Sequence, residues 1–170
     1  MLIDIMFLLS SCIAACSRFT FAKGVTSSYL PLSGVGVRDH VFDHFRENPV
    51  GYGSTYFAHP LCCAAAYATV KHVVDTNVVG NVRKMEPVLR KGLAELVAKH
   101  PSVKSARAYG LGGGFDLAGK DGDFLMHMHE ASDGVAVLKQ ALRDNGIVTL
   151  MRGHHVLCTP PLVISEEEVR

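Results

Sequence analysis

The stretch that decides the fold is Phe19-Thr-Phe-Ala-Lys-Gly-Val-Thr-Ser-Ser-Tyr-Leu-Pro-Leu-Ser-Gly-Val-Gly-Val37, in which β-branched residues are mixed with glycine, serine and proline. This composition predicts short strands joined by tight turns. Lys23 lies at the end of the first such strand, between apolar residues and a glycine. A lysine becomes a nucleophile when its amino group loses its solvation. Lys23 is therefore a candidate nucleophile, although a solvated lysine at a strand end is the commoner case.

The composition of the chain is that of a globular protein. It has 170 residues, of which 48% are hydrophobic and 19% charged, enough for one domain or two small lobes. Seventeen Lys and Arg residues against sixteen Asp and Glu residues give a formal charge of +1. This balance indicates neither a nucleic-acid nor a membrane partner and favours a small-molecule site.

Cysteines and histidines give no sign of a disulfide framework or a metal site. The five cysteines are odd in number, lack metal-ligand spacing and include the adjacent pair Cys62 and Cys63. They predict reduced, buried thiols in an intracellular protein, cytoplasmic or mitochondrial. The histidine pairs lack the further ligands that zinc requires, and no metal is predicted. These pairs are His40 with His44, His127 with His129, and His154 with His155.

The N-terminal apolar run over residues 6–16 is not interpreted as a secretory signal. The residues before it include Asp4 and lack Lys or Arg, whereas a signal peptide begins with a positively charged region. The run is also too short and too rich in serine to cross a bilayer.

Periodicity and capping signals place the other elements. Pro60 begins a helix that extends to about residue 75, and its apolar first half predicts burial on most sides. A second helix covers residues 82–99, and Pro87 within it predicts a later start or a kink. A short helix is expected over 39–45, followed later by two strands over 103–117 around a turn at 110–114. A further helix is capped by Ser132 or Asp133 and closed by Gly146. A strand pair over 147–151 and 156–159 about the turn 152–155 and a helix-capping box at 165–168 complete the chain.

Two further sites carry residues suited to binding anions. Ser54 and Thr55 precede the helix that begins at Pro60, where hydroxyls and unpaired backbone N–H groups form a candidate phosphate site. An ordinary capped loop accounts for them equally well. Arg152 lies between two predicted strands, where its guanidinium could bind a substrate carboxylate through two hydrogen bonds. A surface arginine on a hairpin is the more frequent case.

Taken in order, these segments resemble the class III pyridoxal-phosphate-dependent aminotransferases, the family of ω-amino acid and GABA transaminases. The resemblance covers nearly everything from Phe19 onwards. Four stretches carry it: Thr20 to Val35, Gly53-Ser-Thr-Tyr-Phe-Ala-His-Pro60 with its alanine-rich helix, Ala108-Tyr-Gly-Leu-Gly-Gly-Gly-Phe-Asp-Leu117, and Leu150-Met-Arg152 followed by Thr159-Pro-Pro-Leu-Val-Ile164.

The resemblance implies a role for each candidate residue. Lys23 matches the lysine that forms a Schiff base with pyridoxal 5′-phosphate and moves the substrate proton. Thr55 matches the threonine that reaches the phosphate of the other subunit's cofactor in a homodimer, and Ser54 precedes it in the candidate phosphate site. Arg152 matches the arginine that binds a substrate carboxylate. The implied activity is the transfer of an amino group from an amino acid or ω-amino donor to a keto acid, with no nucleic-acid or membrane partner.

The implied fold is the α/β fold of the aspartate-aminotransferase type (fold type I), and we expect it to be incomplete. Residues 1–74 would form the end of the large cofactor-binding domain, with residues 7–18 an insertion foreign to the family. Residues 75–170 would form most of the small C-terminal α+β domain, cut short at its last helix. Members of the family are much longer, so we expect this chain by itself to be inactive.

Two alternatives to a transaminase stay open at this point. One is a non-catalytic remnant that only interacts with other subunits. The other is a racemase or aminomutase of the same fold, which would use the same lysine and cofactor.

Overall fold

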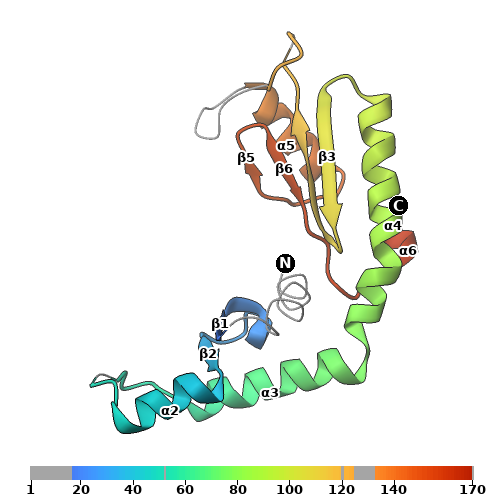
Figure 1. Ribbon diagram of the computed structural model, residues 1–170. Coiled ribbons are helices and arrows are strands. Elements are labelled where there is room, and N and C mark those ends of the chain that lie inside the picture. The colour runs from blue at the N-terminus through green and yellow to red at the C-terminus, as the bar shows by residue number, and fades with distance from the viewer. Residues whose placement is uncertain (1–16, 52, 120, 125–132, 170) are drawn as a thin grey trace. The chain divides into compact units, whose positions relative to one another are not determined.

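The computed structural model describes residues 17–51, 53–119, 121–124 and 133–169. They belong to two compact units, which meet in the sequence between Asn77 and Val78. The first unit contains β1, η1, β2, α2 and α3, and the second contains α4, β3 to β6, α5 and α6 (Figure 1). That the two units are the end of a large domain and most of a small domain stays a prediction.

The first unit begins with an antiparallel strand pair. Strand β1 (Arg18–Phe21) pairs with β2 (Gly34–Val37) so that Phe21 lies opposite Gly34. The connection opens with the 3-10 helix η1 (Lys23–Thr26). The prediction of short strands is therefore confirmed, whereas the segment between Phe21 and Gly34 is a longer connection with a 3-10 helix and not a tight turn.

Two helices complete the first unit. Helix α2 covers Asp39–Glu47, two residues longer than expected, and α3 covers Pro60–Asp75 with Pro60 in its first turn. Helix α3 packs against η1. The expectation that the first half of α3 is buried on most sides was wrong, because Cys62 is its only buried residue while Leu61 and Tyr67 are 62% and 71% exposed. The described residues supply a layer on one side of this helix only.

The second unit is built on α4 (Val78–Lys99), which packs along β3. In Figure 1 this helix runs beside the sheet. Its buried face carries residues at helical spacing, and with Leu111 these form the hydrophobic core. The core residues are Val82, Met85, Leu89, Leu93 and Leu111, against which Ala106, Ala108, Phe115 and Cys158 also pack.

Four antiparallel strands in the order β3-β4-β6-β5 form the sheet of this unit. Their bounds are Val103–Tyr109, Gly112–Leu117, His155–Cys158 and Met151–Arg152. Because successive side chains of a strand point to opposite faces, Ala106, Ala108 and Phe115 face α4 while their neighbours in sequence face away from it. The face away from α4 is called the outer face below.

Three expectations for this unit need correction. Helix α4 begins at Val78 and includes Pro87, so the expectation of a later start was wrong, and a kink at the proline stays a prediction. The first hairpin turn is confined to Gly110 and Leu111, since β4 already begins at Gly112. Arg152 belongs to strand β5 and not to the turn, because Gly153 takes a φ of 55° and closes a two-residue connection.

The ends of the last two helices agree with their sequence signals. Helix α5 (Asp133–Asp144) is followed by Gly146 with a φ of 78°. Before α6 (Glu166–Val169), Ser165 Oγ donates to Glu168 Oε2 at 2.8 Å, and the Glu168 amide donates back to Ser165 Oγ at 3.3 Å. The predicted capping box is therefore confirmed.

Some expectations concern residues outside the described ranges: the insertion over 7–18 (all but its last two residues), the Ser132 cap, and the histidines at 127 and 129. In the part of the chain that the structure does describe, no helix combines the length and apolarity needed to cross a bilayer.

Cysteine burial is only partly as expected. Cys62 is buried and Cys158 half-buried, and burial raises the pKa of the Cys158 thiol. Cys63 is exposed, so the expectation of a buried thiol was wrong there. Adjacent residues of a helix point in different directions, so Cys62 can be buried while Cys63 is exposed.

Candidate functional site

The segment that carries Lys23 has an unusual backbone. Lys23, Ser27 and Ser28 have φ values of 56°, 50° and 65°, in the left-handed region that residues other than glycine rarely adopt. Each such residue costs on the order of 1 kcal/mol, and residues of this kind cluster at active sites and ligand-binding segments. Three of them within six positions mark this segment as one whose shape is held by the structure around it.

Thr26 holds this segment in place. Its side chain is fully buried, and its hydroxyl donates a hydrogen bond to the carbonyl of Leu30. The Tyr29 amide donates to the Thr26 carbonyl at 3.1 Å, and the Ser27 amide donates to Gly24 at 2.9 Å. Thr26 could not be recognised from the sequence, because a threonine within a serine-rich turn gives no signal of burial.

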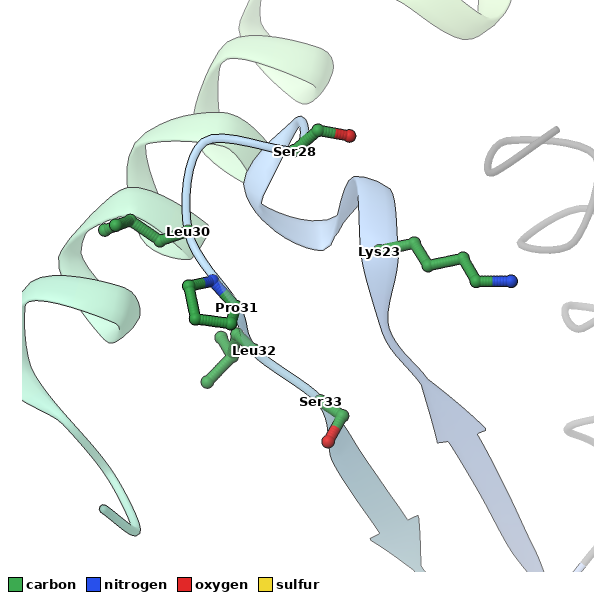
Figure 2. A pocket seen from close by; sticks show the side chains of 6 residues that line it. All are labelled: Lys23, Ser28, Leu30, Pro31, Leu32 and Ser33. Atoms are coloured by element: carbon green, nitrogen blue, oxygen red, sulfur yellow. The ribbon is translucent and has the colours of Figure 1, made fainter.

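Lys23 lines an open hollow of about 600 Å³ together with Ser28, Leu30, Pro31, Leu32 and Ser33, which we call the Lys23 hollow. Leu30, Pro31 and Leu32 lie on the loop that leads to β2, and the extended Lys23 side chain points away from that loop (Figure 2). Among the described residues, this side chain makes neither a hydrogen bond nor an ion pair. Its amino group is thus exposed, on the side away from Leu30, Pro31 and Leu32.

Ser54 and Thr55 lie in the exposed loop before α3 and do not line the Lys23 hollow. The Phe57 amide donates to the Ser54 carbonyl at 3.1 Å, which forms a turn directly before the helix. His59, the residue at the helix cap, makes no side-chain capping hydrogen bond. The first amides of α3 are therefore not capped by the side chain of His59, an arrangement suited to an anion.

Arg152 lies in the second unit, exposed at the end of the edge strand β5. The other candidates, Lys23, Ser54 and Thr55, all belong to the first unit. Arg152 pairs with His155 of β6 across the two-residue turn. An exposed arginine on a short hairpin can reach a carboxylate that approaches from solvent.

The outer face of the sheet holds a polar cluster that the sequence analysis missed. Asp116 is only 4% exposed, and no other carboxylate among the described residues is buried. Its Oδ1 lies 2.7 Å from Nδ1 of His155, and its Oδ2 accepts a hydrogen bond from Ser105 Oγ at 2.8 Å and from Arg107 at 3.2 Å. The only sequence signal was an acidic residue within the apolar strand Phe115-Asp-Leu117.

The surroundings of Asp116 favour its charged form. Burial by itself raises the pKa of this carboxyl, but hydrogen bonds from His155 and Ser105 and the charge of Arg107 outweigh that effect and hold the pKa below its usual value. A depressed pKa in the folded state means that the carboxylate stabilises the fold above its unfolded pKa of about 3.9, and that this contribution is lost as the pH falls through the folded value.

We expect Asp116→Asn to lower the stability of the second unit at neutral pH by about 1–3 kcal/mol, because charge-assisted hydrogen bonds are lost. We also expect a shallower loss of stability below about pH 4, since the variant has no carboxylate to protonate there. Urea unfolding followed by circular dichroism between pH 2 and pH 7 measures both. The control is Asp144→Asn, which alters an exposed carboxylate bonded to Gln140. An unchanged acid slope in Asp116→Asn would contradict the assignment.

The chain is similar in sequence to known aminotransferases. The sequence model of the family described as Aminotransferase class-III matches residues 15–170. The putrescine–pyruvate aminotransferase of Pseudomonas aeruginosa is 30% identical over 150 residues, which are 87% of this chain and 32% of that protein. The mitochondrial gamma aminobutyrate transaminase 1 of Solanum lycopersicum is 28% identical over 155 residues, 88% of this chain and 30% of that protein.

Solved structures agree with the sequence comparison. The taurine:2-oxoglutarate aminotransferase from Bifidobacterium kashiwanohense, in complex with PLP and glutamate, superposes with a TM-score of 0.81 and 33% identity, covering 90% of this chain and 36% of that one. A PLP-bound amine transaminase from an uncultivated Pseudomonas species gives a TM-score of 0.82 at 25% identity, covering 91% and 36%. The predicted α/β fold is confirmed, and the chain spans about a third of the length of these proteins.

Proposed function

Because this chain belongs to the class-III aminotransferases, we propose that it is the C-terminal part of a pyridoxal-phosphate-dependent transaminase. In that enzyme an amino group passes from an amino acid or ω-amino donor to a keto acid. The observation that carries the proposal is Lys23 itself, an exposed lysine that lines the Lys23 hollow on a segment with three left-handed residues. An intracellular location for the enzyme stays a prediction.

Lys23 fits the aldehyde end of the cofactor, because its amino group is exposed and points away from the loop that carries Leu30, Pro31 and Leu32. When bound, pyridoxal phosphate supplies an electron sink that makes a proton next to the amino group acidic. Lys23 Nζ would hold the cofactor covalently and then carry that proton, since it is the titratable group at the hollow. The remaining cofactor contacts would come from the N-terminal part that longer family members have.

Ser54 and Thr55 are proposed to bind a cofactor phosphate in a homodimer. Their loop precedes the N-terminus of α3, and they do not line this chain's own Lys23 hollow. Both facts support a site completed by the other subunit. A hydroxyl and backbone amides at a helix N-terminus are a favourable environment for a phosphate dianion.

The test of this function needs a complete enzyme, in which residues 19–170 replace the matching third of a class-III relative. We expect that hybrid to transfer amino groups to pyruvate or 2-oxoglutarate from at least one amine donor. Dependence of turnover on the keto acid separates a transaminase from a racemase or mutase of the same fold. If the hybrid folds, binds pyridoxal phosphate and converts an amino acid without any keto acid, transamination is the wrong assignment.

Arg152→Ala is expected to raise the KM of the hybrid for keto acids about ten- to a hundred-fold, the effect of losing hydrogen bonds to a charged group. A donor amine without a carboxylate should keep its KM, because it has no group for the guanidinium to bind. Steady-state kinetics with the two substrate classes measure this difference. Arg143→Ala, which removes an exposed arginine in the last turn of α5, is the matched control. Equal effects on both substrate classes would contradict a carboxylate-binding role.

A further inference from the structure

The outer face of the sheet carries a row of polar side chains that leads to Arg152. Strand pairing places Ser105 opposite Asp116, Asp116 opposite His155, and His155 opposite Arg152. Residues directly opposite each other in antiparallel strands lie on the same face with their Cβ atoms about 5 Å apart. The row therefore runs from β3 to the edge strand that carries Arg152.

The buried Asp116 occupies the centre of this row. Both of its oxygens are engaged, Oδ2 by Ser105 and Arg107 and Oδ1 by the ring of His155 at 2.7 Å. The His155 ring fits beside β4 because Gly114 has no side chain, and a Cβ at Gly114 would lie 3.0 Å from the ring and 2.6 Å from the Val156 carbonyl. A charge-assisted hydrogen bond in a covered position is among the stronger polar contacts in proteins.

The turn that follows Arg152 makes a second set of contacts, through His154. The ring of His154 stacks on Phe124 with their centroids 4.4 Å apart, and Lys104 Nζ lies 4.2 Å from the centroid of the same phenyl ring. The His154 carbonyl accepts a hydrogen bond from the Leu117 amide at 2.9 Å. His155 is thus bonded to Asp116, while His154 stacks on Phe124 and places its Nε2 3.9 Å from the same Asp116 oxygen.

Strand β5 has only two residues and lies at the sheet edge, so its own ladder provides little rigidity. We propose that Asp116 and His155, with Phe124 stacked on His154, are positioning residues that fix the place of the Arg152 guanidinium. This inference rests on the proposed carboxylate-binding role of Arg152. In this proposal these residues act on Arg152 through the hairpin and not by binding substrate themselves.

Hydrogen exchange of the 170-residue chain tests the positioning directly. We expect His155→Phe, which keeps a ring without the donor, to speed exchange of the Leu117 and Leu157 amides about ten-fold or more, as the loss of one hydrogen bond to a charged group implies. These amides bond to His154 and Leu150 of the hairpin segment. Amides in the middle of α4 should keep their rates. Asp144→Asn is the control and should change neither set.

Two further variants keep the test decisive. His155→Asn places an amide donor near the position of Nδ1 and should restore part of the protection, which a simple loss of packing would not allow. Phe124→Leu removes the stacking on His154 but keeps the contact between His155 and Asp116. It should speed hydrogen exchange of the Leu117 amide more than that of the Leu157 amide. If hydrogen exchange became equally faster in the hairpin and in α4 in all variants, the proposal would be overturned, because these residues would then stabilise the whole unit and not the hairpin in particular. Unchanged rates in His155→Phe would overturn it as well.

Kinetics of the hybrid enzyme then test whether the position of the Arg152 guanidinium affects the binding of keto acids. His155→Phe should raise KM for keto acids several-fold and leave carboxylate-free donors unaffected, and it should have no additional effect in an Arg152→Ala background. If Arg152→Ala itself leaves the keto-acid KM unchanged, the proposed role of Arg152 fails, while the exchange data still decide whether the hairpin is held by Asp116. If exchange accelerates but KM does not move although Arg152→Ala raises it, the positioning role is refuted.

Discussion

Lys23→Ala is expected to abolish covalent attachment of pyridoxal phosphate and to lower transamination by at least about 10²–10⁴-fold, the usual loss when a positioned proton carrier is removed. The reason is that Nζ of Lys23 is proposed to hold the cofactor and to move the substrate proton. No nearby group replaces it, because the other described residues that line the Lys23 hollow carry only hydroxyl or aliphatic side chains.

Borohydride reduction followed by peptide mapping measures the attachment, and keto-acid-dependent turnover of the hybrid enzyme measures the activity. The matched control is Lys71→Ala, since Lys71 is an exposed lysine of the same unit, paired with Asp75 on α3. Its loss should leave both readouts unchanged. Reduced cofactor found on another lysine in the unmodified hybrid, or full turnover in Lys23→Ala, would refute the assignment of Lys23.

Leu111→Ala is expected to destabilise the second unit by about 2–5 kcal/mol, the range for truncating a buried leucine. Leu111 is 1% exposed and extends from the β3–β4 turn into the core formed by Met85, Leu89 and Leu93 of α4. Alanine would leave a cavity that the backbone of the turn cannot fill. Since whole domains are stable by only about 5–15 kcal/mol, this change would remove a large share of the total.

Urea unfolding followed by circular dichroism gives the measurement. Leu111→Met preserves most of the buried volume and should cost less than about 1.5 kcal/mol. Leu150→Ala makes the same truncation at a side chain that is 53% exposed and should be close to neutral. A cost below about 0.5 kcal/mol for Leu111→Ala would mean that the turn does not contribute to the core as its burial indicates.

The parts of the fold that were predicted correctly have local causes. Pro60 at a helix start, Gly146 after a helix and the Ser165–Glu168 capping box all act within one turn of chain, so neighbouring residues suffice to identify them. The start of α4 was predicted wrongly for the opposite reason. Local rules at Pro87 favoured a later start, but the helix already begins at Val78, and Val82, Met85 and Leu89 pack in the core on both sides of the proline.

The candidate site divides in the same way. Lys23 at the end of a strand could be located from the sequence, whereas its left-handed backbone depends on Thr26, whose burial no local pattern reveals. Asp116, Ser105 and His155 are separated by up to fifty residues in the chain and meet only because β3, β4 and β6 pair in one register. A pairing of that kind is a long-range property, and a shift by one residue would move every side chain to the other face.

The sequence by itself therefore determined the family and the order of most helices and strands, because ordered motifs and local capping need no knowledge of distant contacts. It also supplied the candidate residues Lys23, Ser54, Thr55 and Arg152, whose roles stay predictions. The tertiary structure decided which side chains are covered and which meet. It placed Arg152 in a strand, left Cys63 exposed to solvent, and brought the carboxylate of Asp116 within hydrogen-bond distance of His155. Burial and cross-strand register arise from the packing of segments far apart in the chain, and only the folded chain brings those segments together.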